Sequence, residues 1–232
     1  MKFSQRLIPG TLVRRYKRFL SDIELADGEI VTAHCPDPGS MIGLDAPGSS
    51  VWVSRATKRT RKLAYSWELI RVDGHLVGIN TSLPNALVEE ALRAERIPEL
   101  AGYRAIRREV PYGRNSRVDF LLEDDARGEC YVEVKNVHLK RGPAAEFPDS
   151  VTARGTKHLH ELMDVVDRGA RAVMMYVVQR GDCDGFAIAA DIDPVYAEAL
   201  DRAIDKGVEA ICYQCRVSLK AIELENPLPL AI

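Results

Sequence analysis

The chain changes in character near Ser82, and this change constrains the fold more than any other feature of the sequence. Before it, short apolar stretches alternate with turn-forming segments such as ADGE, CPDPGS, DAPGSS and VDGH. Gly, Pro and Asp favour tight turns, so residues 1–84 are predicted to form a small β-barrel, an OB-like barrel being one option. After it, helical and strand patterns alternate, which predicts a mixed α/β domain over residues 85–232. The predicted class is therefore α+β in two domains.

Six strands are predicted before the boundary, from the apolar stretches between the turns. They are Leu12–Arg18, Phe19–Leu25, Ile30–Ala33, Ser50–Ser54, Ser66–Val72 and Leu76–Ile79. The segment SLPNALVEEALRAERIPEL then has helical spacing, with Asn85 as the expected N-cap and Pro98 ending the pattern.

The order predicted for the second domain is helix, three strands, helix, strand, helix and two strands. The three consecutive strands are Tyr103–Pro111, Arg117–Glu123 and Glu129–Leu139. The next helix lies within FPDSVTARGTKHLHELMDVVDRGA, where Leu159, Leu162 and Val166 repeat at helical spacing. The continuous apolar run RAVMMYVVQ that follows predicts a central strand buried on both faces.

Charge is distributed unevenly along the chain. The net charge is −2, which argues against a uniformly basic nucleic-acid coat. Residues 1–85 nevertheless hold 12 Lys and Arg against 8 Asp and Glu, whereas the remainder holds 20 against 26. A nucleic-acid surface is therefore expected on the first domain.

The cysteines and the hydropathy pattern point to a reducing compartment. Five cysteines without a regular framework argue against a secreted disulfide scaffold. The first twenty residues lack the apolar core of a signal peptide, and no apolar stretch approaches the length of a membrane span. We therefore expect a cytoplasmic protein with no membrane partner.

The segment RVDFLLEDDARGECYVEVKN places three charged residues inside two apolar strands. Side chains alternate faces along a strand, so Glu133 and Lys135 share a face. The intervening turn allows the two strands to pair as a hairpin, which brings Asp119 beside Glu133. Two carboxylates suit Mg²⁺ or Mn²⁺, and a neighbouring lysine can stabilise developing negative charge or position a water molecule. The alternative is an exposed hairpin in which Glu133 and Lys135 form a simple surface pair.

The order Asp…Glu-x-Lys, with these secondary-structure elements around it, resembles the core of the PD-(D/E)xK nuclease superfamily. That resemblance implies metal binding by Asp119 and Glu133 and a catalytic role for Lys135. The superfamily usually adds an acidic residue from its first helix, for which Glu89 and Glu90 are the candidates.

Several longer segments resemble one family, the sugar fermentation stimulation protein A family. They are RYKRFL, HCPDPGSM, RVDFLL, YVEVKNVHL and FPDSVTARGTKHLHEL, and they span nearly the whole chain in order. The resemblance implies an N-terminal OB-like domain, a C-terminal restriction-endonuclease-like domain, DNA binding and a bacterial role in regulating sugar (maltose) metabolism. The family segment N-x-L-x-x-E-A selects Glu90 as the helix acid. One loop departs from the family's usual CPNTGSM, because Asp37 and Pro38 stand where the family has Asn and Thr.

Basic residues are expected to contact nucleic-acid phosphates in three groups. The first two groups, in the barrel, comprise Arg14, Arg15, Lys17 and Arg18, and then Arg55, Lys58, Arg59, Arg61 and Lys62; the third, from the helix after the acidic strands, comprises Arg154 and Lys157. Trp52, Tyr65 and Trp67 flank the second group and could stack on bases, as aromatic residues do in OB folds. The alternative is a solvated loop with these aromatic residues packed in the barrel core.

Two functions remain open from the sequence. The first is a nuclease dependent on Mg²⁺ or Mn²⁺ that acts on DNA. The second is a DNA-binding regulator of sugar metabolism genes whose nuclease-like domain does not cut. A small-molecule binder is a third class, and the oligomeric state is open, a homodimer being one option.

Overall fold

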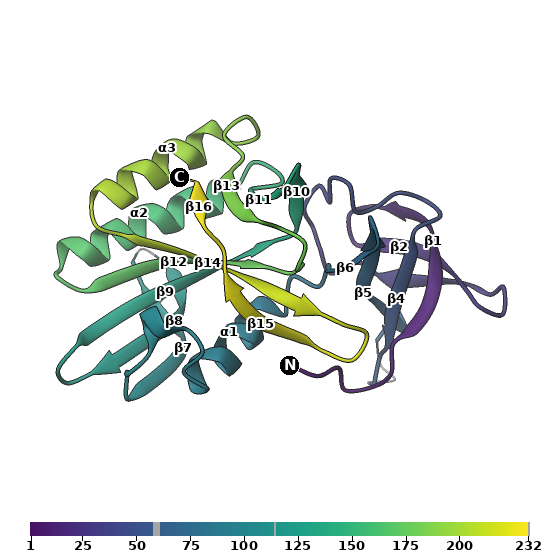
Figure 1. Ribbon diagram of the computed structural model, residues 1–232, viewed down its shortest axis with the longest axis horizontal. Coiled ribbons are helices and arrows are strands. Elements are labelled where there is room, and N and C mark those ends of the chain that lie inside the picture. The colour runs from purple at the N-terminus through teal and green to yellow at the C-terminus, as the bar shows by residue number, and fades with distance from the viewer. Residues whose placement is uncertain (58–60, 114, 232) are drawn as a thin grey trace.

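The computed structural model describes residues 1–57, 61–113 and 115–231 and contains two domains side by side (Figure 1). The smaller domain is a β-barrel, and the larger one is a twisted sheet with helices on both faces. None of the helices in the described part of the chain is long and apolar enough to cross a membrane.

The first domain is a closed five-stranded barrel with one additional strand. Its strands are β1 (Ile8–Tyr16), β2 (Leu20–Leu25), β3 (Ile30–His34), β4 (Ser50–Arg55), β5 (Tyr65–Val72) and β6 (His75–Gly78). β1 pairs antiparallel with both β2 and β4, and β3 closes the barrel by pairing in parallel with β5. This is the strand order of an OB fold. All six predicted strands are present, but β1 begins earlier than predicted and ends before Lys17, so that residues 17–19 form a turn.

The second domain is built on a six-stranded sheet in the order β15-β14-β12-β9-β8-β7. These strands are β7 (Ala105–Tyr112), β8 (Ser116–Asp124), β9 (Gly128–Val137), β12 (Arg171–Val178), β14 (Glu209–Val217) and β15 (Ile222–Pro227). Helix α1 (Pro84–Arg93) covers one face, whereas α2 (Ala153–Asp167) and α3 (Pro194–Asp205) cover the other (Figure 1). β12 pairs in parallel with β9 and β14, and the residues Ala172–Val178 are all buried. The apolar run was therefore correctly predicted as a central strand.

Two local predictions were wrong. Helix α1 begins at Pro84 with Leu83 as its N-cap, so Asn85 lies inside the first turn and its side chain is used elsewhere. The helix ends at Arg93 rather than near Pro98, and Glu95 adopts a left-handed φ of 50°. Pro98 instead opens a short 3₁₀ helix, η1 (Pro98–Leu100).

A small four-stranded sheet was not foreseen. It contains β10 (Leu139–Arg141), β11 (Ala144–Phe147), β13 (Gly185–Ile188) and β16 (Leu230–Ala231). Its strands have four residues or fewer, which is too short for a clear alternation of apolar and polar residues. β11 leads directly into the segment before α2, so this sheet supports one wall of the cleft described below.

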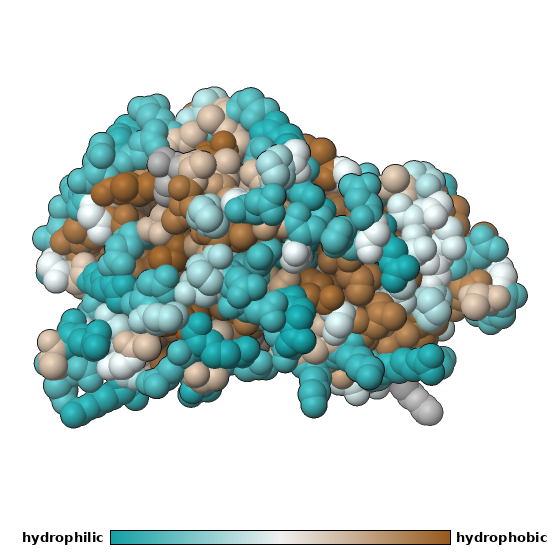
Figure 2. Space-filling view, viewed as in Figure 1, coloured by the Kyte–Doolittle hydropathy of each residue, from teal (hydrophilic) through white to brown (hydrophobic). Residues whose placement is uncertain are grey.

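A common hydrophobic core joins the two domains. Trp52 and Leu69 of the barrel belong to the same buried cluster as Leu87 of α1 and Ile222 of β15. Figure 2 shows hydrophobic residues gathered where the barrel meets the larger domain. At the start of the chain, Lys2 forms a β-bridge with Ala221 in the larger domain. The barrel is therefore held in a defined orientation against the sheet.

Candidate active site

Asp119 lies where β8 separates from β9. The two strands pair from Asp124 and Gly128 to Phe120 and Val132. One residue further along β8, the Asp119 carboxylate accepts a hydrogen bond from the backbone nitrogen of Val134 at 2.8 Å. Its other oxygen accepts one from the Asn85 side chain at 2.7 Å. Burial raises the pKa of Asp119, and the nearby charge of Glu133 raises it further.

Glu133 is a buried carboxylate with one engaged and one unengaged oxygen. Its side chain is 4% exposed, and Oε1 accepts hydrogen bonds from Lys135 Nζ at 2.7 Å and from His158 Nδ1. Oε2 is buried and has no hydrogen-bond partner within the described parts of the chain. Burial raises the pKa of Glu133, but the hydrogen bond from His158 and the charge of Lys135 outweigh it, so that the net shift is downward. The carboxylate is thus kept ionised.

His158 and Arg154 of α2 support this carboxylate from one side. Arg154 Nε donates to His158 Nε2 at 3.3 Å, which leaves Nδ1 as the ring nitrogen that carries a proton toward Glu133. The histidine therefore orients Glu133 in the manner of an outer-shell group at a metal site. Its spacing from Arg154 on α2 was visible in the sequence, but its contact with Glu133, 25 positions away, was not.

The structure does not bring Glu90 to this cluster, which corrects the expectation that it would complete a metal site. Five positions on a helix correspond to a rotation of about 140°, so Glu90 points away from the side of α1 that carries Asn85. Its carboxylate instead contacts the Met1 amino group at 3.1 Å and Arg96 at 3.0 Å. Glu89, the other helix candidate, contacts Arg93 at 2.8 Å and Arg108 at 2.6 Å. From α1, only Asn85 contacts Asp119 among the described contacts.

A further buried acidic residue, Glu161 of α2, acts on the same tyrosine hydroxyl as Asp119 and Glu133. The charges of Glu133, Glu161 and Asp119 all add to burial in raising the pKa of the Tyr112 hydroxyl. Tyr112, the last residue of β7, is therefore close enough to all three carboxylates to be affected by their charges. Glu161 is 5% exposed and contacts Lys157 at 3.6 Å. Its position one helical turn from His158 is the sequence signal that could have identified it.

A cleft between the domains opens beside Lys135. This interdomain cleft has a volume of about 520 Å³. Arg18, Pro38 and Thr81 line one side, and Lys135, Val151 and Arg154 line the other. Lys135 has a side chain only 12% exposed, so it reaches the cleft from a largely buried position. The cleft thus brings basic residues of both domains to the catalytic candidate.

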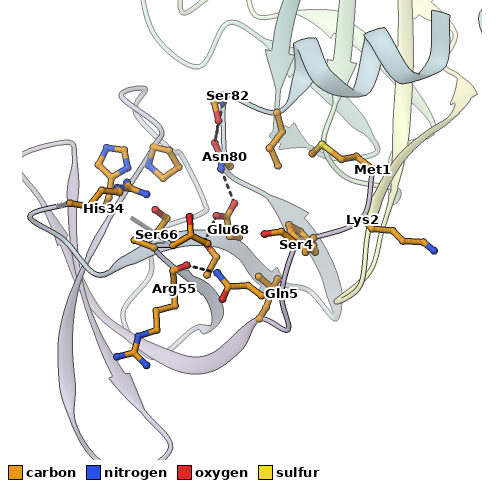
Figure 3. Close-up of a pocket in the computed structure, with 18 residues that line it drawn as sticks. Met1, Lys2, Ser4, Gln5, His34, Arg55, Ser66, Glu68, Asn80 and Ser82 are labelled. Atoms are coloured by element: carbon orange, nitrogen blue, oxygen red, sulfur yellow. Dashed lines mark hydrogen bonds between the residues drawn. The ribbon is translucent and has the colours of Figure 1, made fainter. Parts of the chain in front are cut away.

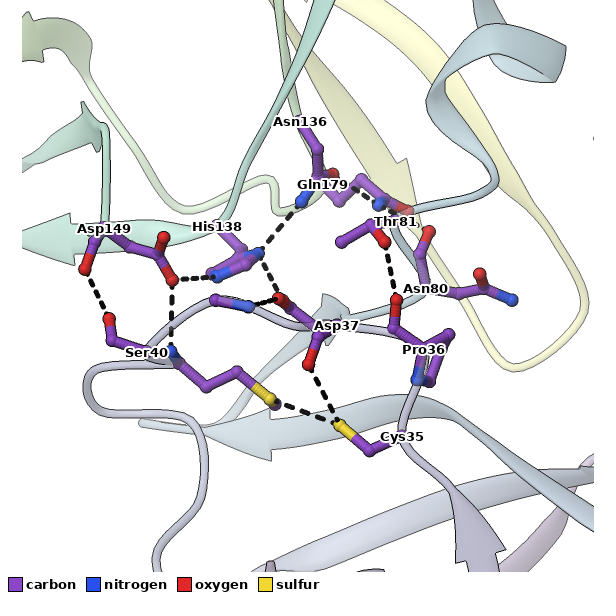
Figure 4. Close-up of polar contacts among 12 residues, drawn as sticks. Cys35, Pro36, Asp37, Ser40, Asn80, Thr81, Asn136, His138, Asp149 and Gln179 are labelled. Carbon is purple, nitrogen blue, oxygen red and sulfur yellow. Dashed lines mark hydrogen bonds and ion pairs between the residues drawn. The ribbon is translucent and has the colours of Figure 1, made fainter. Parts of the chain in front are cut away.

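Asp37, His138 and Asp149 form what we call the interdomain clip. It holds the barrel loop that follows β3, which contains Asp37, against the sheet domain. His138 lies between the two carboxylates, with Nδ1 at 3.2 Å from Asp37 and Nε2 at 3.3 Å from Asp149 (Figure 4). Asp149 also accepts from the backbone nitrogen of Met41 at 3.1 Å. The three residues are close enough to be considered as metal ligands, but the two carboxylates address opposite nitrogens of one ring. The imidazole hydrogen-bonds Asp149 through Nε2 and lies within ion-pair distance of Asp37 through Nδ1, which suits a protonated ring between two carboxylates.

The first group of predicted phosphate-binding residues, Arg14, Arg15, Lys17 and Arg18, divides into residues that stabilise the barrel and residues that remain exposed. Arg15 has a side chain only 10% exposed and donates to the backbone oxygens of Asp37 at 3.0 Å and Gly39 at 2.7 Å, so it stabilises the barrel loop. Arg14 contacts Asp22 at 2.8 Å and remains 66% exposed. Lys17 and Arg18 lie exposed at the turn between β1 and β2.

Two members of the second basic group line another cavity, of about 570 Å³, between the barrel and the N-terminal segment. Arg55 and Arg61 line it, and Figure 3 shows Glu68 pointing into it, bonded to Asn80. Lys62 is exposed nearby. Lys58 and Arg59 lie outside the described residues. On α2, Arg154 lines the interdomain cleft and Lys157 donates to Ser116 at 3.0 Å.

The tryptophans do not form a stacking surface. Trp67 is fully buried in the barrel core, and Trp52 is 8% exposed at the domain junction. The alternative interpretation, aromatic residues packed in the barrel core, is therefore correct for Trp67, whereas Trp52 packs in the core that the two domains share. Alternation along the strands could not show that Trp52 is buried, because the outer face of β4, which would otherwise meet solvent, is covered by the second domain.

The structure is of the class that joins an OB barrel to a restriction-endonuclease-like α/β domain. Residues 13–79 match the model for the SfsA N-terminal OB domain, and residues 82–221 match that for the sugar fermentation stimulation protein RE domain. The chain belongs to the sugar fermentation stimulation protein family.

Known relatives resemble the chain along its whole length. A sugar fermentation stimulation protein homolog of Paramagnetospirillum magneticum is 58% identical, covering 98% of this chain and 97% of the relative. The homolog of Rhodospirillum centenum is also 58% identical, with both chains covered in full. A solved structure, described as that of Pyrococcus furiosus SfsA in complex with Ca²⁺, is 29% identical with a TM-score of 0.90 and covers 100% of this chain and 98% of its own.

Proposed function

We propose that the chain is a nuclease dependent on Mg²⁺ or Mn²⁺ that hydrolyses phosphodiester bonds of DNA. The observation that carries the proposal is the buried, ionised Glu133, which has an unengaged oxygen beside Asp119 and Lys135. An ionised buried carboxylate is costly unless a cation or hydrogen-bond donor satisfies it. Lys135 and His158 satisfy only Oε1, which leaves Oε2 for a divalent cation.

Asp119 and Glu133 would hold the metal ion, because two carboxylates provide the hard oxygen ligands that Mg²⁺ and Mn²⁺ prefer. When bound, the ion would supply Lewis-acid polarisation of a phosphate oxygen and a lower pKa for a water molecule. His158 and Asn85 keep the two carboxylates in place. Lys135 faces the cleft, where its ammonium group would stabilise negative charge on the reacting phosphate.

The alternative function is a DNA-binding regulator of sugar (maltose) metabolism genes that does not cut. It is favoured by the family's name and by the basic residues on both walls of the cleft. Incubation of the protein with labelled duplex and single-stranded DNA in Mg²⁺ and in Mn²⁺ decides between the two. Cleavage supports the nuclease, and binding without cleavage under either metal supports the regulator. We also propose a cytoplasmic location, because all five cysteines are free and buried.

The metal site itself can be tested without DNA. Replacement of Glu133 by Gln is expected to lower Mn²⁺ affinity by about a hundredfold or more, because the loss of an outer-shell partner alone typically costs 10- to 100-fold. His158→Ala is expected to fall within that smaller range. Isothermal titration of Mn²⁺ measures both, and the melting temperature in EDTA checks that each variant folds. Glu90→Gln is the matched control and should bind like the parent protein. Equal losses in the Glu90 and Glu133 variants would refute the assignment.

The basic group near the second cavity gives a salt-dependent prediction. Joint replacement of Arg55, Arg61 and Lys62 by Ala is expected to flatten the dependence of log K for DNA on log salt. Each lost phosphate contact reduces the slope by roughly 0.9 for duplex and 0.7 for single strands. Arg202, Lys206 and Arg216 of the larger domain, replaced together, give a control of equal charge. Fluorescence anisotropy across a salt series measures the slope, and an unchanged slope in the first variant would remove these residues from the interface.

A further inference from the structure

The turn between β1 and β2 has an unusual backbone. Lys17 and Arg18 both adopt left-handed φ values, of 49° and 63°. Residues other than Gly, Asn and Asp rarely adopt this conformation, because their side chains strain the backbone there. Two consecutive basic residues are nevertheless kept there, and Arg18 lies at the interdomain cleft. We name residues 17–19 the hairpin tip.

The next residue of the hairpin tip, Phe19, has a fixed backbone and an open ring. Its backbone oxygen accepts a hydrogen bond from Cys35 N at 2.9 Å, and its backbone nitrogen donates to Lys17 at 2.7 Å. Phe19 nevertheless remains 49% exposed. It does not itself line the cleft, but it directly follows Arg18, which does. An aromatic ring on a rigid turn beside an arginine is the combination that proteins use to stack on unpaired bases.

The opposite wall of the cleft has the same mixed chemistry. Arg154 and Lys135 supply positive charge, and Val151 is apolar and 75% exposed. Pro38, which is exposed, adds further apolar surface to the cleft. A duplex, which presents phosphates on its outside, would contact only the positively charged side chains of the cleft. An unpaired strand would contact both the charged and the apolar side chains, because each nucleotide presents a phosphate and the flat apolar face of a base.

The size of the cleft is compatible with binding of a nucleotide of an unpaired strand. A volume of about 520 Å³ falls within the range of pockets that take one small ligand, about 300–1,000 Å³. The interdomain clip lies in the same cleft and joins its two walls. The two walls are therefore held together by contacts within the protein itself.

We propose that the cleft takes an unpaired DNA strand, with Phe19 stacking on a base and Arg18 contacting a phosphate near Lys135. This rests on the proposed function and deepens it, since it specifies single-stranded DNA, or the single-stranded end of a duplex, as the substrate. Arg18 is in this arrangement a positioning residue that acts across the domain boundary on the strand presented to the metal site.

Fluorescence anisotropy with a labelled single-stranded 12-mer and a blunt duplex of the same sequence, both in CaCl₂ and in EDTA, tests the proposal. The single strand is expected to bind at least tenfold more tightly than the duplex. Phe19→Ala is expected to weaken single-strand binding roughly tenfold or more, in line with stacking on one base. Phe19→Trp should restore it. Ile30→Ala is the matched control, because Ile30 is an exposed apolar residue of the same barrel (61% exposed).

The outcomes separate this proposal from the proposed function. Duplex binding as tight as single-strand binding, or a Phe19→Ala variant that binds like the parent protein, would overturn the single-strand assignment while leaving the nuclease intact. Strong binding of the single strand, together with no cleavage of it in Mg²⁺ or in Mn²⁺, would support the cleft assignment and refute the nuclease. An RNA 12-mer of the same sequence is expected to bind more weakly than the DNA, and tighter RNA binding would overturn the choice of DNA.

Discussion

Replacement of Lys135 by Ala is expected to lower the rate of DNA cleavage by about a hundredfold or more. Groups that stabilise charge developing in a transition state typically contribute 10²–10³ to the rate. The ammonium group contacts Glu133 Oε1 at 2.7 Å and also faces the cleft, so its removal leaves the metal ligands present but the reacting phosphate without its cation. Single-turnover cleavage in saturating Mg²⁺ measures the chemical step.

DNA affinity should change little in the same variant, because other cations of the cleft remain. Lys206→Ala is a suitable control, since Lys206 lies at the end of α3, where it contacts Asp167 at 2.7 Å. The melting temperature of the Lys135 variant should also be recorded, because Glu133 loses a partner. Cleavage at the parent rate in a folded Lys135→Ala protein would remove Lys135 from the mechanism.

Replacement of His138 by Ala is expected to destabilise the protein by about 3–5 kcal/mol, the typical cost of removing one partner from a buried ion pair. Asp37 and Asp149 would then face each other across the domain junction without the imidazole between them. Urea unfolding at pH 6 measures the loss. His75→Ala, at an exposed site on β6, should leave stability unchanged.

The interdomain clip also predicts how stability depends on pH. Burial and the charge of Arg180 lower the pKa of His138, but its hydrogen bond with Asp149 and the charges of Asp37 and Asp149 raise it above the ordinary value. A raised folded-state pKa means that the stabilisation is complete below the unfolded value, about 6.5, and is lost as pH rises through the folded value. Burial also raises the pKa of Asp37, so its ionisation opposes folding as pH rises. Burial likewise raises that of Asp149, but its bond with His138 outweighs this, and the net pKa is lowered.

The measurable consequence lies above pH 6.5. The stability difference between the parent protein and His138→Ala should shrink as pH rises from 6.5 toward 9. Arg180, which contacts Asp182 at 2.6 Å, and Lys140, at 3.0 Å from the same carboxylate, are the neighbouring cations, and both are retained in the His138→Ala variant. A difference that stays constant with pH would show that His138 is neutral in the folded protein.

The sequence predicted those parts of the site that depend on local periodicity. Alternation along β9 placed Glu133 and Lys135 on one face, and the short connection to β8 brought Asp119 to them. Asn85 and His158 complete the site through contacts 34 and 25 positions away in the chain, which no local pattern encodes. Glu90 was assigned from a family motif, but its rotation around α1 directs it elsewhere.

In the barrel, too, local sequence patterns predicted the strands but not the contacts between distant residues. Its strands were predictable because each turn contains Gly, Pro or Asp between apolar stretches. Which of its aromatic residues remain exposed was not, because burial of Trp52 depends on the second domain, and because Phe19, predicted to begin a strand, lies in a turn. The exposed aromatic residue of the hairpin tip thus became apparent only from the fold.

The shared core at the domain junction means that the barrel and the sheet domain are not independent folding units. A fragment ending at residue 79 would expose Trp52 and Leu69 to water, and an isolated second domain would expose Leu87 and Ile222. Exposed apolar surface of this kind promotes aggregation. DNA-binding studies on the separated barrel would therefore be affected by its newly exposed apolar surface. Point variants in the intact chain keep the domain junction buried. Trp52 fluorescence, observed in a variant without Trp67, would then report whether the two domains separate before either unfolds.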